Sequence, residues 1–197
     1  LGASVGASRA AVDSGWIPSN TSNDYFIADI CSQYPNSYVG LDTPQLPLPI
    51  LREWFWRRGK WGKRKTEVGN GRHCEVVIKA HNLANPQWTP MADKAPYWMQ
   101  IGFSMFKEFK TRCPVYEVFP SASYNLFQAI PEVSCSLSFE NFRPGPKDML
   151  DAVIAAITVF EFIKGHGCEV GGGDGLGTII LPRPIPNPKL GVLHWTE

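Results

Sequence analysis

Hydrophobic and polar positions along this chain follow two alternating periods, as in α/β proteins. A helical period lies at about residues 22–34, 71–81, 95–110, 121–130 and 147–164, and short apolar runs that predict strands lie at 37–42, 115–119 and 178–181. Strands that alternate with helices indicate a sheet with helices packed against it. We therefore expect one α/β domain over residues 1–197, with a central sheet flanked by helices.

The first twenty residues do not fit this alternation. They are small and polar without a clear period, so a hydrophobic first strand is not visible there. The expected fold therefore has an N-terminal strand that is missing or divergent.

The last helical run carries two acidic residues, Asp148 and Asp151, ahead of an almost continuous apolar stretch. Acids in the first turn complement the exposed N–H groups of a helix, which accounts for Asp148. Asp151 lies about one turn further in, among apolar residues, so capping explains it poorly. Residues three apart share a helix face, and we expect the two carboxylates to point at one small volume.

Two more acidic residues lie near the ends of predicted strands. Asp42 ends the apolar run at 37–42, before Pro44, and Glu117 lies in the run at 115–119. Ligand sites of α/β sheets lie at the carboxyl ends of strands. Carboxylates that converge there repel each other unless a cation lies between them, and oxygen ligands favour Mg²⁺ or Mn²⁺. Asp42, Asp148 and Asp151 are thus candidate metal ligands, and Asp42, Asp151, Asp148 and Glu117 are candidate catalytic residues.

A basic, aromatic-rich insertion lies at about residues 52–70. Residues 52–65 contain seven basic side chains against one acid, a local charge of +6, with Trp54, Phe55, Trp56 and Trp61 between them. Basic groups neutralise phosphates and aromatic faces stack on unpaired bases, so we expect a nucleic-acid contact here. The candidate residues are Arg57, Arg58, Lys60, Trp61, Lys63, Arg64 and Lys65. The alternative is a solvated loop whose tryptophans pack on the protein body.

The amino-acid composition narrows the possible classes of protein without identifying one. Hydrophobic residues make up 44% of the chain and charged residues 19%, and the formal net charge is only +1, so any nucleic-acid partner must be inferred from where the charge lies. Five cysteines without a CxxC pair, and no secretory signal, indicate a reduced, cytoplasmic setting. No apolar run reaches membrane-spanning length. The glycine-rich segment at 171–177 follows a helix and precedes a strand, so it predicts a turn rather than a phosphate cradle.

Five short motifs occur in the order typical of one family. They are VGLDTP at 39–44, RHCE at 72–75, YEVFPSAS at 116–123, DMLDA at 148–152 and IILP at 179–182. In this order they resemble the domain-of-unknown-function 429 family (DUF 429), a predicted nuclease family with a ribonuclease H-like fold. The resemblance spans residues from about 37 to 182.

This resemblance implies a mixed five-stranded sheet and a divalent-metal centre built from acids on the first strand, the fourth strand and the last helix. Asp42 would be the fourth-strand acid, Asp151 with Asp148 the last-helix acid, and Glu117 would lie at the rim. Arg72 and Glu75 match a family motif without an assigned role, and we expect Arg72 to contact phosphate. The family's early aspartate has no convincing counterpart, so either the N-terminus is truncated or the metal centre is degenerate, with Asp13 as a substitute ligand.

The leading hypothesis is a divalent-metal-dependent nuclease that hydrolyses phosphodiester bonds of DNA or RNA, with Mg²⁺ or Mn²⁺ as cofactor. The alternatives are a catalytically inactive nucleic-acid or nucleotide binding module on the same fold, and a small-molecule phosphate hydrolase.

Overall fold

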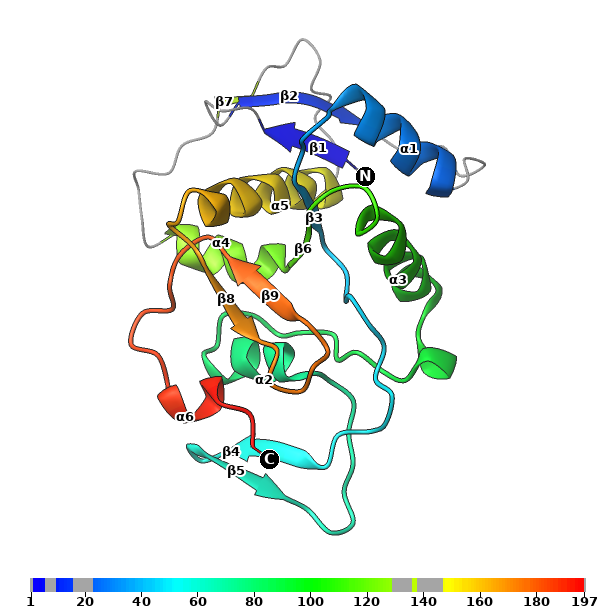
Figure 1. Ribbon diagram of the computed structural model, residues 1–197. Coiled ribbons are helices and arrows are strands. Elements are labelled where there is room, and N and C mark those ends of the chain that lie inside the picture. The colour runs from blue at the N-terminus through cyan, green and yellow to red at the C-terminus, as the bar shows by residue number, and fades with distance from the viewer. Residues whose placement is uncertain (1, 6–9, 16–22, 129–135, 138–146, 197) are drawn as a thin grey trace.

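The computed structural model describes residues 2–5, 10–15, 23–128, 136–137 and 147–196 (Figure 1). The strands are β1 (Gly2–Val5), β2 (Ala10–Gly15), β3 (Val39–Leu41), β4 (Trp54–Arg57), β5 (Lys60–Lys63), β6 (Val115–Val118), β7 (Ser136–Leu137), β8 (Cys168–Gly171) and β9 (Thr178–Leu181). The helices are α1 (Asn23–Gln33), α2 (His73–Ala80), α3 (Tyr97–Phe109), α4 (Pro120–Gln128), α5 (Lys147–Ile163) and α6 (Leu190–Leu193), with a short 3-10 helix, η1 (Ala92–Lys94).

The central sheet is mixed, as the resemblance implies. Its order is β3-β6-β9-β8, in which β3, β6 and β9 run parallel and β8 pairs antiparallel with β9. The five-stranded sheet that the resemblance implies is not what the described residues form, since this sheet has four strands. Leu41 of β3 pairs with Glu117 of β6, so Asp42 follows at the same edge at which Glu117 lies.

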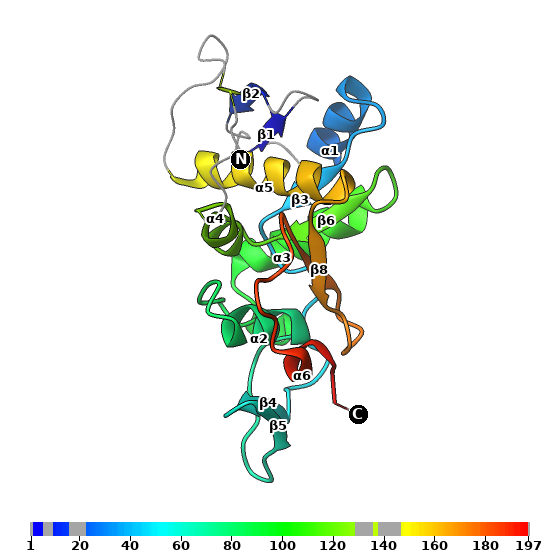
Figure 2. The same ribbon diagram turned by 90° about the vertical axis from the view of Figure 1, so that its left-hand side faces the viewer.

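The position of helix α5 between two layers explains why its sequence is apolar nearly all round. It packs on β3, β6 and β9 with one face and on the N-terminal strands β1 and β2 with another, and both views of the ribbon place it between these two layers (Figures 1 and 2). A helix that is covered on two sides needs apolar residues on both. The small N-terminal sheet, with the order β1-β2-β7, was not visible in the sequence.

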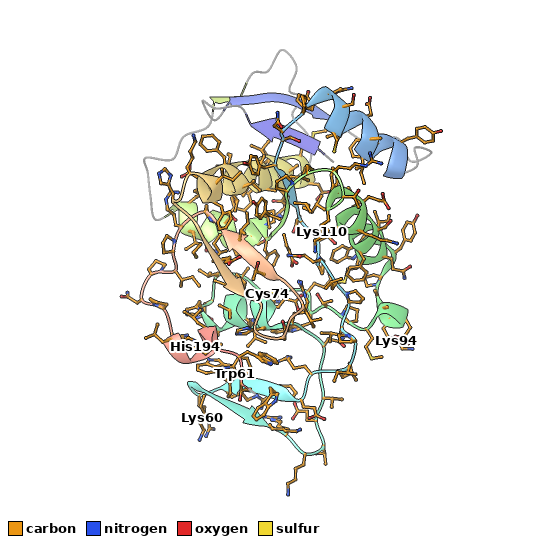
Figure 3. The ribbon with its side chains drawn as sticks, in the orientation of Figure 1. Lys60, Trp61, Cys74, Lys94, Lys110 and His194 are labelled. Atoms are coloured by element: carbon orange, nitrogen blue, oxygen red, sulfur yellow. The ribbon has the colours of Figure 1, made fainter. Side chains whose placement is uncertain are left out.

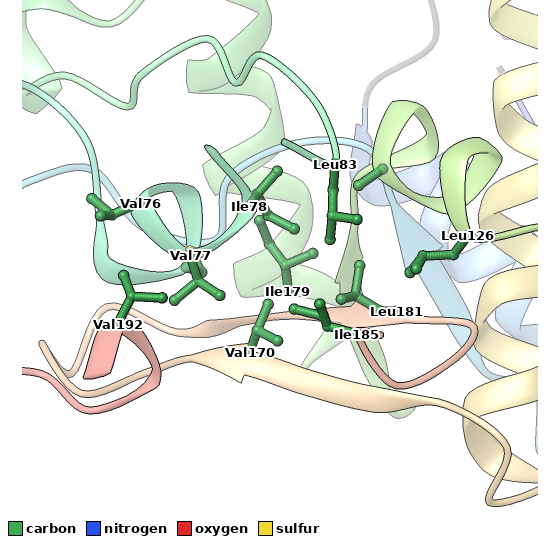
Figure 4. Packing of buried hydrophobic residues seen from close by; sticks show 12 residues of the cluster. Val76, Val77, Ile78, Leu83, Leu126, Val170, Ile179, Leu181, Ile185 and Val192 are labelled. Carbon is green, nitrogen blue, oxygen red and sulfur yellow. The ribbon is translucent and has the colours of Figure 1, made fainter. Parts of the chain in front are cut away.

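The largest buried cluster lies on the other part of the central sheet (Figure 4). Val77 and Ile78 of α2 pack in one cluster with Ile179 and Leu181 of β9. α2 also lies close to the end of β8, where a Cβ at Gly171 would be 2.4 Å from the Cα of Cys74. This packing fixes the N-terminal end of α2 beside the edge of the sheet that carries Asp42 and Glu117.

Residues 54–63, inside the basic segment at 52–70, form a β-hairpin. β4 pairs antiparallel with β5, and Trp56 faces Trp61 across the two strands. The two-residue turn has positive φ at Arg58 and Gly59, 51° and 78°, as hairpin turns of this length require.

Candidate functional site

Asp42 is placed by the close approach of three elements. It follows β3 directly, and a Cβ at Gly40 of that strand would lie 2.8 Å from a methyl carbon of Val159 in α5. On the other side, a Cβ at Gly102 of α3 would lie 1.8 Å from Thr43 Oγ1. Glycine at these two positions therefore lets α5 and α3 come close to the end of β3, which brings acids of α5 towards Asp42.

Asp151 is the buried member of the pair on α5. The residue is 8% exposed, whereas Asp148 is exposed. Its Oδ2 accepts a hydrogen bond from Lys147 Nζ at 2.6 Å, but its Oδ1 is buried and has no hydrogen-bond partner among the described residues. A buried carboxylate oxygen without a partner costs free energy, which a cation at this position would recover.

The charges of the site act on Asp42. Burial of the carboxyl and the negative charge of Asp151 raise the pKa of Asp42 to about 7, with smaller contributions from Glu117 and Asp148, and only Lys147 acts in the opposite direction. The residue is nevertheless exposed at the surface, so water screens part of this repulsion. The structure thus brings Asp42 and Asp151 together, with Asp148 further out.

Tyr124 of α4 is a neighbour of this pair that the sequence did not indicate. Burial and the negative charge of Asp151 raise the pKa of the Tyr124 hydroxyl to about 12, so it stays protonated at neutral pH. No sequence signal separates this tyrosine from an ordinary helix residue, because its role depends on how α4 packs on α5.

Arg72 and Glu117 form a buried ion pair beside the carboxylates. Arg72 Nη1 donates to Glu117 Oε2 at 2.8 Å and Arg72 Nη2 donates to Glu117 Oε1 at 2.5 Å. The other acceptors of the guanidinium are Glu75 Oε1, Thr89 Oγ1 and the Leu176 carbonyl. Burial opposes the charge of Arg72, but the acidic groups around it keep its pKa above the ordinary value.

These contacts bear on two predicted roles. Arg72 is 1% exposed and its donors face protein acceptors. The phosphate contact that we expect of Arg72 stays a prediction. Both oxygens of Glu117 accept hydrogen bonds from Arg72, and Oε2 also accepts from the Gln45 N–H at 3.0 Å. Glu117 therefore holds Arg72 in place. Glu75, which belongs to the RHCE motif but was not a candidate site residue, is part of the same network. Its position three residues after the N-cap of α2 is the sequence signal for this role.

A small cavity lies between the ion pair and Asp42. It has a volume of about 50 Å³, and Asp42, Thr43, Arg72, Glu117 and Trp98 are among the residues that line it. This volume holds a few water molecules at most. Among the described residues, no group of three or more His, Cys, Asp or Glu side chains has the spacing of a metal site. The described side chains therefore supply two carboxylates, those of Asp42 and Asp151, as ligands for a cation, and not a complete coordination shell.

The basic hairpin lies apart from the carboxylates, at the other end of the molecule (Figure 1). Several of its charges are paired with acids of the same region: Arg57 and Arg64 with Glu67, and Lys63 with Glu53. Arg58, Lys60 and Lys65 are exposed and make no ion pair within the part of the chain that the structure describes. Figure 3 shows Lys60 pointing away from the body.

Trp61 packs on the protein rather than facing solvent. Its Nε1 donates to the carbonyls of Gly191 at 3.0 Å and His194 at 2.9 Å, and its ring lies 5.0 Å from that of Trp195 (Figure 3). Trp56 contacts it edge-on at 5.6 Å. Trp56 and Trp61 thus pack on the protein body, as in the alternative stated above, and Arg58, Lys60 and Lys65 are the exposed basic residues of the segment.

The glycine-rich segment is the turn between β8 and β9, so it follows a strand and not, as the sequence indicated, a helix. The carboxylate of Asp174 accepts hydrogen bonds from the N–H of His73 at 2.6 Å and from that of Leu176 at 3.1 Å. The Gly173 N–H donates to His73 Nδ1 at 3.1 Å. This loop therefore caps the start of α2 with its own carboxylate, at the position that a phosphate would need.

Comparisons with models of protein families, with curated proteins and with solved structures found no match to this chain. The resemblance to the DUF 429 family therefore rests on the five motifs alone, and the ribonuclease H-like fold stays a prediction. In the described ranges, no helix has the length and apolar character needed to cross a membrane. Asp13 lies in β2, in the N-terminal sheet, which is a different sheet from that of Asp42.

Proposed function

We propose that this chain binds a divalent cation, Mg²⁺ or Mn²⁺, between Asp42 and Asp151 and hydrolyses phosphodiester bonds of nucleic acid. The observation that carries the proposal is the effect of Asp151 in α5 on Asp42 at the end of β3, whose pKa the negative charge of Asp151 raises, together with the buried Oδ1 of Asp151, which has no hydrogen-bond partner among the described residues. Two carboxylates placed this close are stabilised by a positive charge between them.

The donor set fits a magnesium-type ion. Mg²⁺ is usually bound through one or two carboxylates, and water and substrate phosphates complete its coordination. Two acids without a third protein ligand therefore suffice when a phosphate is the substrate. A bound cation would supply charge stabilisation for a phosphoryl oxygen and a more acidic water.

The residues of the chain have separable roles in this proposal. Asp42 and Asp151 hold the cation, and Asp148, exposed at the start of α5, adds negative charge at its rim. Lys147, whose side chain is 69% exposed, bonds Asp151 when no metal is bound and is free to move to solvent when one is. Glu117 and Arg72 keep the ends of β6 and α2 together below the site.

The hairpin is the proposed grip on the nucleic-acid strand. Its unpaired basic residues Arg58, Lys60 and Lys65 neutralise backbone phosphates, and this contact does not depend on base sequence. The path of the chain from Asp42 to Arg52 connects the carboxylates to the hairpin, so a bound strand would lie along this side of the molecule (Figure 1).

A second candidate function has one observation in its favour. Because the described residues contain no group of three metal-ligating side chains, a module that binds nucleic acid through the hairpin without cleaving it is the alternative. The third candidate function is a small-molecule phosphate hydrolase, which would use the same carboxylates and would not need the hairpin to bind its substrate.

A cleavage assay separates these functions. Labelled single-stranded and duplex DNA and RNA are incubated with the protein and Mn²⁺, with Asp42→Asn and Asp151→Asn as test variants and Asp93→Asn, an exposed acid on η1, as the matched control. We expect cleavage by the wild type and the control and a loss of at least 100-fold in both test variants. Cleavage that survives both substitutions would refute the proposed site. Binding without cleavage favours the binding module, and hydrolysis of a small phosphate ester with weak competition by oligonucleotides favours the third candidate function.

The hairpin is tested by the salt dependence of binding. Replacing Arg58, Lys60 and Lys65 with alanine should weaken binding to single strands and reduce the slope of log K against log salt by about 2, or about 0.7 per lost phosphate contact. A control with Lys94→Ala and Lys107→Ala, which are exposed lysines outside the hairpin, should leave the slope unchanged. An unaltered slope in the hairpin variant would assign the segment a structural role only.

A further inference from the structure

Two cysteines from distant parts of the chain face each other where α1 meets α3. Cys31 lies in α1, Cys113 lies in the connection from α3 to β6, and their Sγ atoms are 4.0 Å apart although 82 positions separate them in the sequence. α1 and α3 are in contact, and the ribbon shows them side by side. Both residues are half-buried, so small reagents can reach them while other proteins have limited access.

We propose that Cys31 and Cys113 are a thiol-oxidation site, at which a small disulfide such as glutathione disulfide converts the two thiols into an intramolecular disulfide. A disulfide has an S–S length of about 2.05 Å, so the two sulfurs must approach by roughly 2 Å. Rotation about the Cα–Cβ bonds of the two cysteines supplies part of this approach. Cys31 is also near the C-terminal end of α1, and Cys113 follows the last turn of α3, where the backbone adjusts more easily than inside a helix.

The reaction balances with glutathione disulfide as the oxidant. The thiolate of one cysteine attacks a glutathione sulfur, a mixed disulfide forms and one glutathione thiolate leaves. The second cysteine loses its proton to solvent and attacks the protein sulfur of the mixed disulfide, and the second glutathione leaves as thiolate. Two protein thiols are oxidised by two electrons, and one glutathione disulfide is reduced to two glutathione molecules.

The other described cysteines are less suited to this reaction. Cys74 is fully buried in the core, and this burial raises the pKa of its thiol well above the ordinary value. Cys168 is half-buried, its Sγ donates to the Arg183 carbonyl at 3.6 Å, and burial raises its pKa too. Cys135 lies outside the described residues.

The bond would tie together the two segments that enter the central sheet. α1 leads into β3, Cys113 leads into β6, and the Val39 N–H donates to the Pro114 carbonyl at 3.0 Å where these two strands begin. Closing a loop of 82 residues restricts the unfolded chain, so oxidation should raise the Tm of the protein by several degrees, roughly 5–15 °C.

The test uses the full chain with Cys135→Ser, which removes the thiol outside the described residues. Burial and the neighbouring Cys31 raise the pKa of Cys113 to about 11, so the reaction is run at pH 8.5, where more of this slow thiol is ionised. Glutathione disulfide should remove two of the four remaining thiols, and mass spectrometry of a tryptic digest should show the peptides of Cys31 and Cys113 joined.

Single substitutions give the controls. Cys31→Ser and Cys113→Ser should each abolish the joined peptide and the rise in Tm, and Cys168→Ser should keep both. The proposal is overturned if the native protein forms no joined peptide while the same protein in denaturant loses thiols to the same reagent. It is equally overturned if the joined peptide contains Cys168 or Cys74 in place of either partner.

Discussion

Replacing Arg72 with methionine should destabilise the protein in a manner that depends on pH. The guanidinium is 1% exposed and bonds two carboxylates, those of Glu75 and Glu117, whose side chains are 4% exposed. Removing one partner of a buried ion pair costs about 3–5 kcal/mol, because the remaining charge is left in a medium of low polarity. With a denaturation slope of about 2 kcal/mol per molar urea, the unfolding midpoint should fall by about 1.5–2.5 M.

The pH dependence distinguishes this effect from a loss of packing. Burial already raises the pKa of Glu117 against the opposing effect of Arg72, and without the guanidinium the folded-state pKa rises further above its unfolded value. A carboxyl with a raised folded pKa favours folding at low pH, and its contribution is lost as the pH rises through that pKa. The deficit of Arg72→Met should therefore be small near pH 4.5 and approach its full size near pH 7.5.

Urea unfolding followed by tryptophan fluorescence at these two pH values measures both effects. Arg52→Met is the matched control, since Arg52 is only half-buried and bonds the carbonyls of Trp54 and Asn70. Its loss should be about 1 kcal/mol and equal at both pH values. A deficit below 1 kcal/mol in Arg72→Met, or one of the same size at both pH values, would refute the reasoning.

Three further predictions concern the neighbourhood of the site. In EDTA, Asp42→Asn should raise the free energy of unfolding above pH 7, because it removes a carboxyl whose pKa is raised from 3.8 to about 7 in the folded state. For a fully buried group this pKa shift would correspond to about 4 kcal/mol, and solvent screening reduces the expected gain to about 1–2 kcal/mol. The gain should vanish below about pH 4, and an unchanged stability at pH 8 would contradict the prediction. Burial lowers the pKa of His73, so wild-type stability should fall below pH 6.5, by up to about 1.4 kcal/mol per pH unit, and His73→Gln should show a weaker dependence in the same urea titrations. Gly102→Ala should push Thr43 aside and cost about 1–3 kcal/mol, whereas Gly62→Ala, with nothing within 4 Å of its Cβ, should cost less than 1 kcal/mol in thermal unfolding; equal costs would contradict the packing described.

Periodicity located most of the elements around the site. The helical runs at 22–34, 71–81, 95–110 and 147–164 correspond to α1, α2, α3 and α5, and Asp42 follows a strand, as predicted. These segments are long or strongly patterned, and their packing surfaces are local properties of the sequence. The run at 121–130 corresponds to α4 in its described part, which ends at Gln128.

The missed strands have weaker signals. β1 consists of Gly2–Val5, which are small residues without alternation, and it is defined by packing on α5. In β4 and β5 the many basic residues hide the alternation of polar and apolar positions that predicts a strand. Their turn at Arg58 and Gly59 lacks the Asn-Gly or Asp-Gly pair that signals a hairpin. β8 exists because it pairs with β9, and four residues ending in glycine do not indicate this.

Only part of the candidate site could be predicted from the sequence. The proximity of Asp42 and Asp151 follows from the rule that strand ends and a covering helix meet at one edge of a sheet, and the structure brings these residues together. The pairing of Arg72 with Glu117 joins residues 45 positions apart, and no local pattern encodes such a distance. The catalytic, metal-binding and nucleic-acid-binding roles, like the cytoplasmic setting, remain predictions.

Cation binding by Asp42 and Asp151 is the central claim, and isothermal titration calorimetry with Mn²⁺ at pH 7.5 tests it most directly. We predict one Mn²⁺ per chain for the wild type, affinity lowered at least tenfold by Asp42→Asn and by Asp151→Asn, and a smaller loss for Asp148→Asn, whose carboxylate is exposed. Absence of binding to the wild type, or undiminished binding to Asp151→Asn, would contradict the account.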